Sequence, residues 1–552
     1  MRKFKIRKIQ AAILGLSVFL LWSFTAPQND KYFEILKNLD IFATMYKEVN
    51  ANYVDDINPN TIMEVGIDAM LSTLDPYTVY YPEDQIEDVR TENTGQYGGI
   101  GAIVGEKYDK RIMIIMPNEG FAAEKAGLKR GDEILSINGI DVRQDYDKAS
   151  LYLRGQASSK LALKIERPGE GELDIEVELE TIELPNVPYY GMVNEDVGLI
   201  KLTGFTDNAS KEVKSALRQL KKDGAERIIL DLRGNGGGLL NEAVNISNIF
   251  IDKGQLVVTT KGKLKEMNAT YKTLNTGTDL DIPLAVLINS SSASASEIVA
   301  GTMQDYDRGV IIGRKSFGKG LVQRTMPLSY NSQMKVTIAK YYTPSGRCIQ
   351  AIDYSNRNED GSVGKIADSL QTAFQTNNGR VVFDGGGVDP DFGVNRNKLA
   401  PITISLLKAD LFFRFGNEYN GEMPAGQVAS EISISDEVLS EFKLWLAGQT
   451  LDYTSDIQEE IAQLREKASE LGELERIQSQ LEGLESAVAN NLDSDLENSK
   501  EEIRHFIKEE FAARLLLERG IIEASFEVDE DVKKAIEILS DQAHYTQVLS
   551  GN

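Results

Sequence analysis

The chain has 552 residues and a net charge of −25, with 60 Lys and Arg residues against 85 Asp and Glu residues. This length exceeds what one hydrophobic core usually serves and predicts three or four domains. The hydrophobic share of 41% and the charged share of 26% are typical of a globular protein. The acidic balance argues against nucleic acid as the main partner, because phosphate binding needs a basic surface. A single cysteine excludes an intramolecular disulfide, and two histidines with that cysteine argue against a zinc site of the usual ligands.

The N-terminus has the pattern of an export signal. A basic stretch from Arg2 to Lys8 precedes the apolar run 11–24, which has signal-peptide length and is short for a full membrane span. We expect residues 1–29 to be a signal peptide or an N-terminal membrane anchor, since cleavage after Ala26 would put Phe24 at the minus-three position. Basic residues before the run place the rest of the chain outside the cytoplasm. The expected location is the periplasm or cell envelope, with attachment to the inner membrane left open. For the apolar run itself, a buried core helix is the less favoured alternative.

Four further regions differ in their patterns. Residues 30–85 carry apolar residues at helical spacing, and residues 86–182 contain short strands and glycine turns. In residues 183–395 strands alternate with helices, and residues 396–552 are acidic and helical. The alternation predicts α/β layers with sites at the C-terminal ends of strands. The expected fold class is therefore multidomain α/β, with an N-terminal helical segment, a β-rich domain, an α/β core and a C-terminal helical appendage.

The clearest patterns define individual elements. The expected strands cover residues 111–116, 131–139, 161–167, 197–202, 227–232, 284–288, 310–312 and 334–342. The expected helices cover residues 122–128, 147–156, 209–222, 239–250 and 296–304. In the C-terminal region, apolar residues from Ile457 to Val488 recur every three or four positions with one wider gap, which predicts a helical hairpin or coiled pair. We interpret this seam mainly as structure, with a partner-binding arm as the alternative.

Ser294 lies at a junction that suits a nucleophile. The apolar strand 283–288 precedes it and the helix 296–305 follows it. A strand-turn-helix junction exposes a side chain and leaves N–H groups free at the helix start, so the N–H of Ala295 could bind an oxyanion. A flexible loop with a serine helix cap is an equal alternative from the pattern alone. Both histidines lie near the C-terminus, so lysine is the natural base.

Lys319 follows a glycine turn and could be that base. Residues 313–319 fit the first seven positions of a phosphate-binding P-loop, but Gly320 stands where Ser or Thr should hold magnesium, and the next residues are β-like. This disfavours an NTPase and leaves a surface lysine in a glycine turn as the plain alternative. A serine–lysine pair needs a neutral amine, which burial supplies by lowering the lysine pKa from about 10.4. Gln323 could orient the amine, because in an extended chain it shares a face with Lys319.

Two glycine turns can bind negative charge through backbone N–H groups. Gly237 and Gly238 follow a predicted buried strand and could supply a second oxyanion donor, with a simple turn as the alternative. Gly99, Ile100 and Gly101 lead into a strand and could hold the terminal carboxylate of a peptide that pairs with the strand edge. A hairpin turn is the alternative for this second loop.

Together these motifs resemble the carboxyl-terminal processing proteases, the S41 family of serine peptidases. The resemblance covers about residues 31–395 and rests on LDPYTVYYPED (74–84), GGIGA (98–102), PNEGFAAEKAGLKRGDEILSINGIDV (117–142), DLRGNGGG (231–238), SASASEIVAGTMQD (292–305), KSFGKGLVQ (315–323) and KYYTPSGRCIQ (340–350). It implies a PDZ domain over residues 86–182 and a peptidase core over residues 183–395, with layers like those of crotonase and ClpP. The chain departs from the family pattern in the polar insertion 353–384 and in the helices after residue 400.

The resemblance also implies roles for individual residues. Ser294 would be the nucleophile, Lys319 the general base and Gln323 the residue that orients the base, with an acyl-enzyme intermediate and no metal or cofactor. The oxyanion hole would be formed by Ala295, Gly237 and Gly238. The PDZ loop that would take the substrate's C-terminal carboxylate consists of Gly99, Ile100 and Gly101.

The implied function is that of a serine endopeptidase of the cell envelope. Its partners would be proteins or peptides with apolar C-termini, and in relatives the PDZ domain gates the activity. The helical tail could dimerise, contact an adaptor protein or shield the site. A PDZ-type binding scaffold with an inactive protease core is the alternative function.

Overall fold

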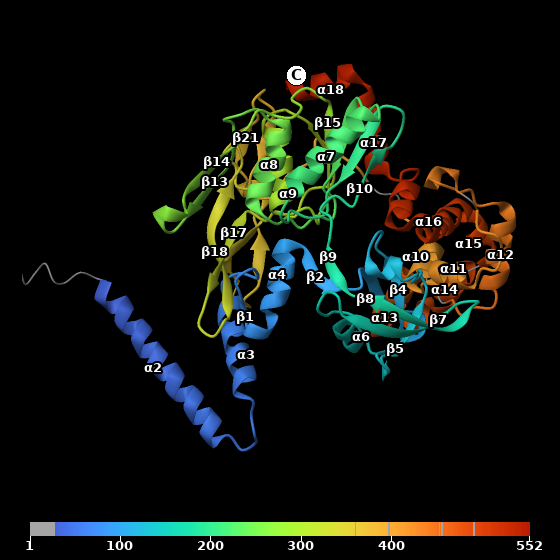
Figure 1. Ribbon diagram of the computed structural model, residues 1–552, viewed down its shortest axis with the longest axis horizontal. Coiled ribbons are helices and arrows are strands. Elements are labelled where there is room, and N and C mark those ends of the chain that lie inside the picture. The colour runs from blue at the N-terminus through green and yellow to red at the C-terminus, as the bar shows by residue number, and fades with distance from the viewer. Residues whose placement is uncertain are drawn as a thin grey trace, which may run out of the picture. The chain divides into compact units, whose positions relative to one another are not determined.

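The computed structural model describes residues 28–551, apart from residues 359, 396–397, 425, 452, 454–455 and 489–491 (Figure 1). The chain divides into two compact units, Met1–Tyr80 and Tyr81–Asn552. The predicted export segment 1–29 lies almost wholly outside the described residues. Among the helices that are described, none is long and apolar enough to cross a membrane.

The first unit is helical. It contains α2 (Gln28–Asn52) and α3 (Pro59–Ser72), with β1 (Val79–Tyr81) at its end. Helix α3 begins after Asn58, whose side chain accepts a hydrogen bond from the N–H of Asn60, and its first residue is a proline. The prediction of an N-terminal helical segment is confirmed.

A β-rich domain opens the second unit. Its elements are η1 (Glu83–Gln85), α4 (Ile86–Thr94), β2 (Gln96–Gly99), β3 (Ala102–Lys107), η2 (Tyr108–Lys110), β4 (Arg111–Pro117), α5 (Ala122–Lys125), β5 (Glu133–Ile137), β6 (Ile140–Asp141), α6 (Tyr146–Tyr152), β7 (Lys160–Arg167), β8 (Gly171–Glu178) and β9 (Glu180–Glu183). One sheet has the order β3-β4-β5-β7-β8, with β6 beside β5, and β2 pairs with β9. Alternate residues of these strands form one buried apolar core.

The centre of the second unit is a six-stranded sheet of order β10-β11-β12-β15-β16-β23. Its strands are β10 (Tyr189–Met192), β11 (Val197–Lys201), β12 (Arg227–Asp231), β15 (Leu284–Ile288), β16 (Val310–Gly313) and β23 (Phe392–Gly393). Only the β10–β11 pair is antiparallel. Helices α7 (Ala209–Lys222), α8 (Leu240–Phe250) and α9 (Ala295–Asp305) cover one face (Figure 1). Both faces of the central strands are apolar, as buried parallel strands require.

Antiparallel strands and small hairpins complete the core. Strands β13 (Leu256–Gly262), β14 (Ala269–Lys272), β17 (Leu321–Pro327) and β18 (Gln333–Tyr342) form one antiparallel group, with η3 (Lys265–Met267) before β14. The polar insertion 353–384 overlaps two hairpins, β19 (Ile352–Arg357) with β20 (Val363–Lys365) and β21 (Ala373–Gln375) with β22 (Val381–Phe383), joined through η4 (Asp368–Leu370).

The C-terminal region is helical. Its elements are α10 (Pro401–Lys408), α11 (Leu411–Glu418), η5 (Ala429–Glu431), α12 (Asp436–Leu446), α13 (Asp456–Glu470), α14 (Leu474–Ala487), α15 (Leu492–Asn498), α16 (Lys500–Ser525), α17 (Glu530–Ser540) and α18 (Gln542–Ser550). Helices α13 and α14 pack together, as the predicted hairpin requires. Most of the region has its own apolar core. Helices α17 and α18, in contrast, pack on the second face of the six-stranded sheet, because Val532, Ala535 and Leu539 form an apolar stripe at helical spacing.

Candidate active site

Ser294 stands in a tight turn between β15 and α9. Its backbone has φ 55° and ψ −109°, a conformation that side-chain-bearing residues rarely adopt and that persists where the surroundings impose it. The N–H of Ser294 donates to Oε2 of Glu297 over 2.8 Å. Its carbonyl accepts from the N–H of Ile298 at 2.9 Å and from the hydroxyl of Tyr341 at 3.1 Å. The strained turn is thus held at both backbone groups, which suits a nucleophile between a strand and a helix.

Glu297 joins the Ser294 turn to the Lys319 turn. Its fully buried carboxylate accepts four hydrogen bonds. Oε2 takes the N–H groups of Ser294 at 2.8 Å and Lys319 at 2.9 Å, and Oε1 takes the N–H of Gly318 at 2.7 Å and the hydroxyl of Ser316 at 2.5 Å. Burial raises the pKa of Glu297, although these four donors oppose the rise. One carboxylate oxygen therefore fixes the backbone of both residues predicted to do the chemistry.

Glu297 is not among the site residues that the sequence predicts. A signal for it exists, because Ser294 and Glu297 have the S-x-x-E spacing of a capping box at the start of a helix. Tyr341, in contrast, has no local signal in the sequence. It lies 47 residues beyond Ser294 in the chain, and only the folded sheet brings the two together.

Gln323 lies in β17, close after Lys319. The pairing of β17 with β18 shifts register between Val322 and Gln323, a bulge that can change the direction of a side chain. The amide Nε2 of Gln323 donates to Oγ1 of Thr337 over 3.1 Å. Thr337 thereby fixes the orientation of the amide, and it is a further residue that the sequence did not indicate.

The glycine turn after β12 approaches the Ser294 turn closely. Gly237 has φ 100°, and a methyl group there would come within 2.7 Å of the Ala293 carbonyl oxygen and 2.9 Å of the Ala295 nitrogen. Only glycine fits this position without displacement. The N–H of Gly237 donates to Oδ1 of Asn235 at 2.9 Å. In this part of the described chain, the N–H groups of Ala295 and Gly238 donate to no protein acceptor.

The backbone N–H groups of Gly238 and Ala295 are therefore the ones available to a ligand. Gly237, which has no side chain, lets the glycine turn lie close to the Ser294 turn. The turn is also tied to the Ser294 turn, because the carbonyl of Asn235 accepts from the N–H of Ala293 at 3.0 Å and from the hydroxyl of Ser296 at 2.9 Å. A shift in one turn must move the other.

All six residues predicted for catalysis and the oxyanion hole line one cleft of about 540 Å³. They are Ser294, Ala295, Lys319, Gln323, Gly237 and Gly238. The cleft is also lined by apolar side chains from β17 and α8, including Leu321 and Leu240. Among the described residues no group of three or more His, Cys, Asp or Glu side chains could hold a metal ion.

The predicted peptide-carboxylate loop lies in the β-rich domain. Ile100 and Gly101 line a cavity of about 230 Å³ between β3 and α6. Gly99 is not among the residues that line this cavity; it lies in β2, where it pairs with Glu180 of β9. Ile100 is buried, and its carbonyl accepts from the N–H of Ala123 at 2.7 Å. Gly101 has φ 69°, and a methyl group there would lie 2.4 Å from the Cβ of Phe121. The loop thus needs glycine at Gly101 to pass this ring.

Comparisons with known proteins agree with this architecture. The family described as Peptidase family S41 matches residues 196–355, PDZ domain matches residues 117–167, and "Probable PDZ-protease, C-terminal helical domain" matches residues 402–539. A carboxy-terminal-processing protease of Bartonella bacilliformis is 35% identical over 350 residues, which are 62% of this chain and 79% of that protein. A "Probable CtpA-like serine protease" of Staphylococcus aureus is 37% identical over 316 residues, 56% of this chain and 62% of that protein. The match therefore spans less than two thirds of the Staphylococcus relative's length.

Among solved structures, the photosystem II D1 C-terminal processing protease has 25% sequence identity and a TM-score of 0.35 to this chain, and the match covers 64% of this chain and 92% of that one. The fold and the family matches define a PDZ-containing peptidase of the S41 class. The chain belongs to the family of carboxy-terminal-processing proteases. The PDZ domain and the peptidase core that the sequence motifs implied are thereby confirmed.

Proposed function

We propose that this chain is a serine endopeptidase that cleaves protein substrates through an acyl-enzyme formed on Ser294. The observation that carries the proposal is the single cleft lined by Ser294, Lys319 and Gln323 together with the glycine turn. Family membership supports the same chemistry.

The proposed reaction begins with proton transfer. The neutral amine of Lys319 takes the proton from the Ser294 hydroxyl as Oγ attacks the scissile carbonyl carbon. The carbonyl oxygen gains negative charge. The N–H groups of Ala295 and Gly238 are available to donate to it, because they donate to no protein acceptor, and these hydrogen bonds stabilise the charge. The lysine then gives its proton to the leaving amine, and the C–N bond breaks to leave an ester on Ser294. Water, deprotonated by the same lysine, then attacks the ester carbonyl. The C–Oγ bond breaks, the acid product leaves, and the lysine returns the proton to Oγ of Ser294. Gln323, held by Thr337, orients the amine without adding charge.

We further propose that the PDZ domain selects substrates by their C-termini. A peptide strand would add to the edge of β3, with its terminal carboxylate at Ile100 and Gly101 and an apolar side chain in the cavity beside α6. Docking there would gate the catalytic cleft. The enzyme would work in the cell envelope, delivered by the N-terminal segment 1–29 either cleaved or kept as an anchor.

The test is a cleavage assay with the purified chain and an unfolded protein that ends in apolar residues. Cleavage should be lost in Ser294→Ala and in Lys319→Ala, and an amidated C-terminus should slow it. Intact-mass analysis after rapid quenching should show an acyl adduct on the wild-type chain. Equal cleavage by wild type and Ser294→Ala would exclude the assignment of the nucleophile. PDZ peptide binding without any cleavage by wild type would favour the alternative, a binding scaffold with an inactive core.

A further inference from the structure

Arg233 links the glycine turn to the C-terminal helices. Its guanidinium makes a two-pronged contact with Asp231, with Nε to Oδ1 at 2.9 Å and Nη2 to Oδ2 at 2.7 Å. Nη1 reaches two further carboxylates, Asp529 and Asp531, each at 2.9 Å. The side chains are mostly buried, with exposed fractions of 13% for Arg233 and 5% for Asp531. Burial lowers the pKa of Arg233, but the three carboxylates outweigh it and raise the pKa overall.

Asp529 and Asp531 stand at the start of α17, which is itself firmly placed. Asp529 caps the helix, because its side chain accepts from the N–H groups of Asp531 and Val532. The apolar face of α17 packs on the second face of the six-stranded sheet. The two carboxylates are therefore attached to a helix that is packed on the sheet. Through them, α17 restrains the guanidinium of Arg233.

Arg233 precedes Gly237 and Gly238 by only four and five residues. Two other contacts hold the loop between them. The N–H of Gly234 donates to the side chain of Asn289 at 3.1 Å, and the side-chain amide of Asn235 donates to the carbonyl of Leu202 at 2.8 Å. We propose that Asp529 and Asp531 are positioning residues for the oxyanion turn, the segment 234–238 that carries the Gly238 N–H. The C-terminal helical region would then form part of the active-site scaffold. This inference rests on the proposed peptidase function.

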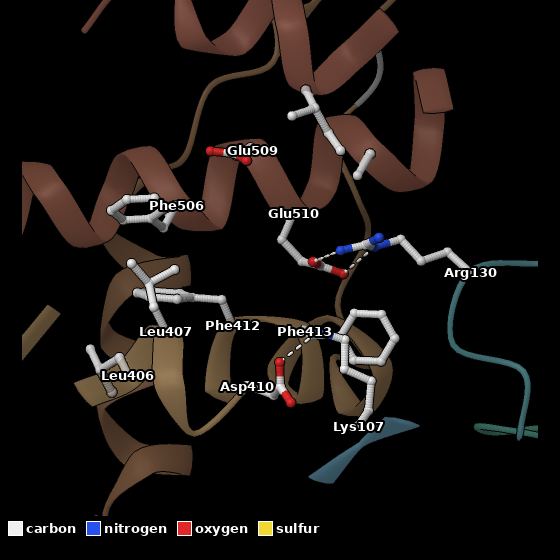
Figure 2. Close-up of a pocket in the computed structure, with 12 residues that line it drawn as sticks. Lys107, Arg130, Leu406, Leu407, Asp410, Phe412, Phe413, Phe506, Glu509 and Glu510 are labelled. Atoms are coloured by element: carbon white, nitrogen blue, oxygen red, sulfur yellow. Dashed lines mark hydrogen bonds and ion pairs between the residues drawn. The ribbon is translucent and has the colours of Figure 1, made fainter. Parts of the chain in front are cut away.

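The same helical region also holds the PDZ domain. Arg130 of the PDZ domain contacts Glu510 of α16 at 3.1 and 2.7 Å, and Lys107 contacts Asp410 at 2.6 Å, as Figure 2 shows. Between Glu510 and the end of α16 the chain bends at Leu517, which has φ 54° and ψ −143°. One connected segment thus carries a charged contact to the PDZ domain and another to the oxyanion turn, with a strained bend between them.

The experiment compares Asp531→Asn with the neighbouring control Glu530→Gln in the full chain. Both variants remove one negative charge from the first turn of α17, but Glu530 pairs with Lys533 and not with Arg233. We expect Asp531→Asn to lower kcat about ten- to a hundredfold with KM changed less than about twofold, because a small misplacement of oxyanion donors acts in the transition state. Glu530→Gln should keep wild-type kcat.

A second readout does not depend on activity. Backbone amide exchange in residues 231–238 should accelerate in Asp531→Asn and stay at the wild-type rate in Glu530→Gln. If Asp531→Asn does not fold, Asp529→Asn replaces it, since asparagine keeps the helix cap while removing the charge. Unchanged kcat and exchange in the aspartate variants would overturn the inference, as would equal changes in Glu530→Gln. Accelerated exchange in a chain whose wild type cleaves nothing would uphold the positioning role and count only against the proposed function.

Discussion

Replacing Glu297 by glutamine tests how the Ser294 turn and the Lys319 turn are held together. The carboxylate accepts two hydrogen bonds at each oxygen, whereas an amide has one accepting oxygen and one NH₂ group that only donates. If NH₂ replaced Oε2, it would face the N–H groups of Ser294 and Lys319, and both contacts would be lost. We expect the amide to keep its oxygen there and to turn NH₂ toward Gly318 and Ser316.

The magnitude follows from that arrangement. The Gly318 N–H loses its acceptor, and the Ser316 hydroxyl must rotate because it now meets a donor. A hydrogen bond to a charged group contributes about 1.5–3 kcal/mol, and a buried donor left without an acceptor costs about 1–3 kcal/mol. Removing a buried charge offsets part of this loss. Glu297→Gln should therefore lower the free energy of unfolding by about 2–3 kcal/mol, and the displaced Lys319 turn should lower kcat about ten- to a hundredfold.

The assay combines urea unfolding with a pH profile of kcat. Because burial raises the pKa of Glu297, acidification protonates it at a higher pH than an ordinary glutamate, and the added proton displaces a donor. Protonation of the general base lowers kcat in acid in both chains. The additional fall of wild-type kcat through the raised pKa of Glu297 should be absent in Glu297→Gln. Glu226→Gln, at an exposed glutamate, is the control. A Glu297→Gln chain with the kcat and pH profile of wild type would refute the reasoning.

Four further outcomes are expected. Thr337→Val removes the acceptor that orients Gln323, so kcat in steady-state assays should fall about fivefold, the effect of one hydrogen bond, and an unchanged kcat would argue against orientation by Thr337. Gly237→Ala places a methyl group 2.7 Å from the Ala293 carbonyl oxygen, so cleavage should drop more than about a hundredfold while peptide binding to the PDZ domain, measured by fluorescence anisotropy, stays at the wild-type level. Arg130→Met should lower the free energy of unfolding by about 1–3 kcal/mol, because Glu510 loses one of its two buried arginine partners and keeps Arg514. Arg143→Met, at an exposed ion pair, should change it by less than about 0.5 kcal/mol, and equal losses in urea unfolding would contradict this. Burial and the adjacent Glu510 raise the pKa of Glu509 from 4.5 to about 7. The folded chain therefore retains a proton that the unfolded chain releases, and the stability from this group is present at low pH and lost as the pH rises through about 7. Glu509→Gln should then exceed wild type in stability at alkaline pH by up to about 3 kcal/mol, a difference that vanishes in acid, and equal unfolding curves at both pH values would exclude it.

The elements predicted most closely are those with a strong period in the sequence. Helix α7 (Ala209–Lys222) and strand β15 (Leu284–Ile288) have the expected bounds, because one has an apolar stripe every three or four residues and the other is wholly apolar. Helix α6 ends at Tyr152, four residues before the predicted end. Arg154 forms a β-bridge with Gly99, so tertiary pairing ends the helix where the sequence pattern alone would continue it.

The site residues that lie close together in the sequence were predictable, whereas contacts between residues far apart in the sequence were not. Ser294 with Ala295, and Lys319 with Gln323, each occur within a few positions, and their turns are visible in the glycine and serine pattern. Of the residues that hold them, Glu297 has a local signal in its capping-box spacing from Ser294, but the contacts between distant or folded segments have none. Tyr341 donates a hydrogen bond to the carbonyl of Ser294, which lies 47 residues earlier in the chain. The hydrogen bond from the Gly237 N–H to the side chain of Asn235 depends on the conformation of the folded turn.

The acidic C-terminal region makes buried contacts that its composition does not indicate. Carboxylates are usually solvated, so a region rich in them is readily interpreted as an appendage. Here Glu510 pairs with Arg130 and Asp531 pairs with Arg233, and these side chains are 5–13% exposed. Removing one side of a buried pair leaves a charge in a site that water reaches poorly, which is strongly destabilising. A chain cut before α10 would expose such charges together with the apolar face of the sheet that α17 covers, so the peptidase core is not expected to fold stably without its C-terminal helices.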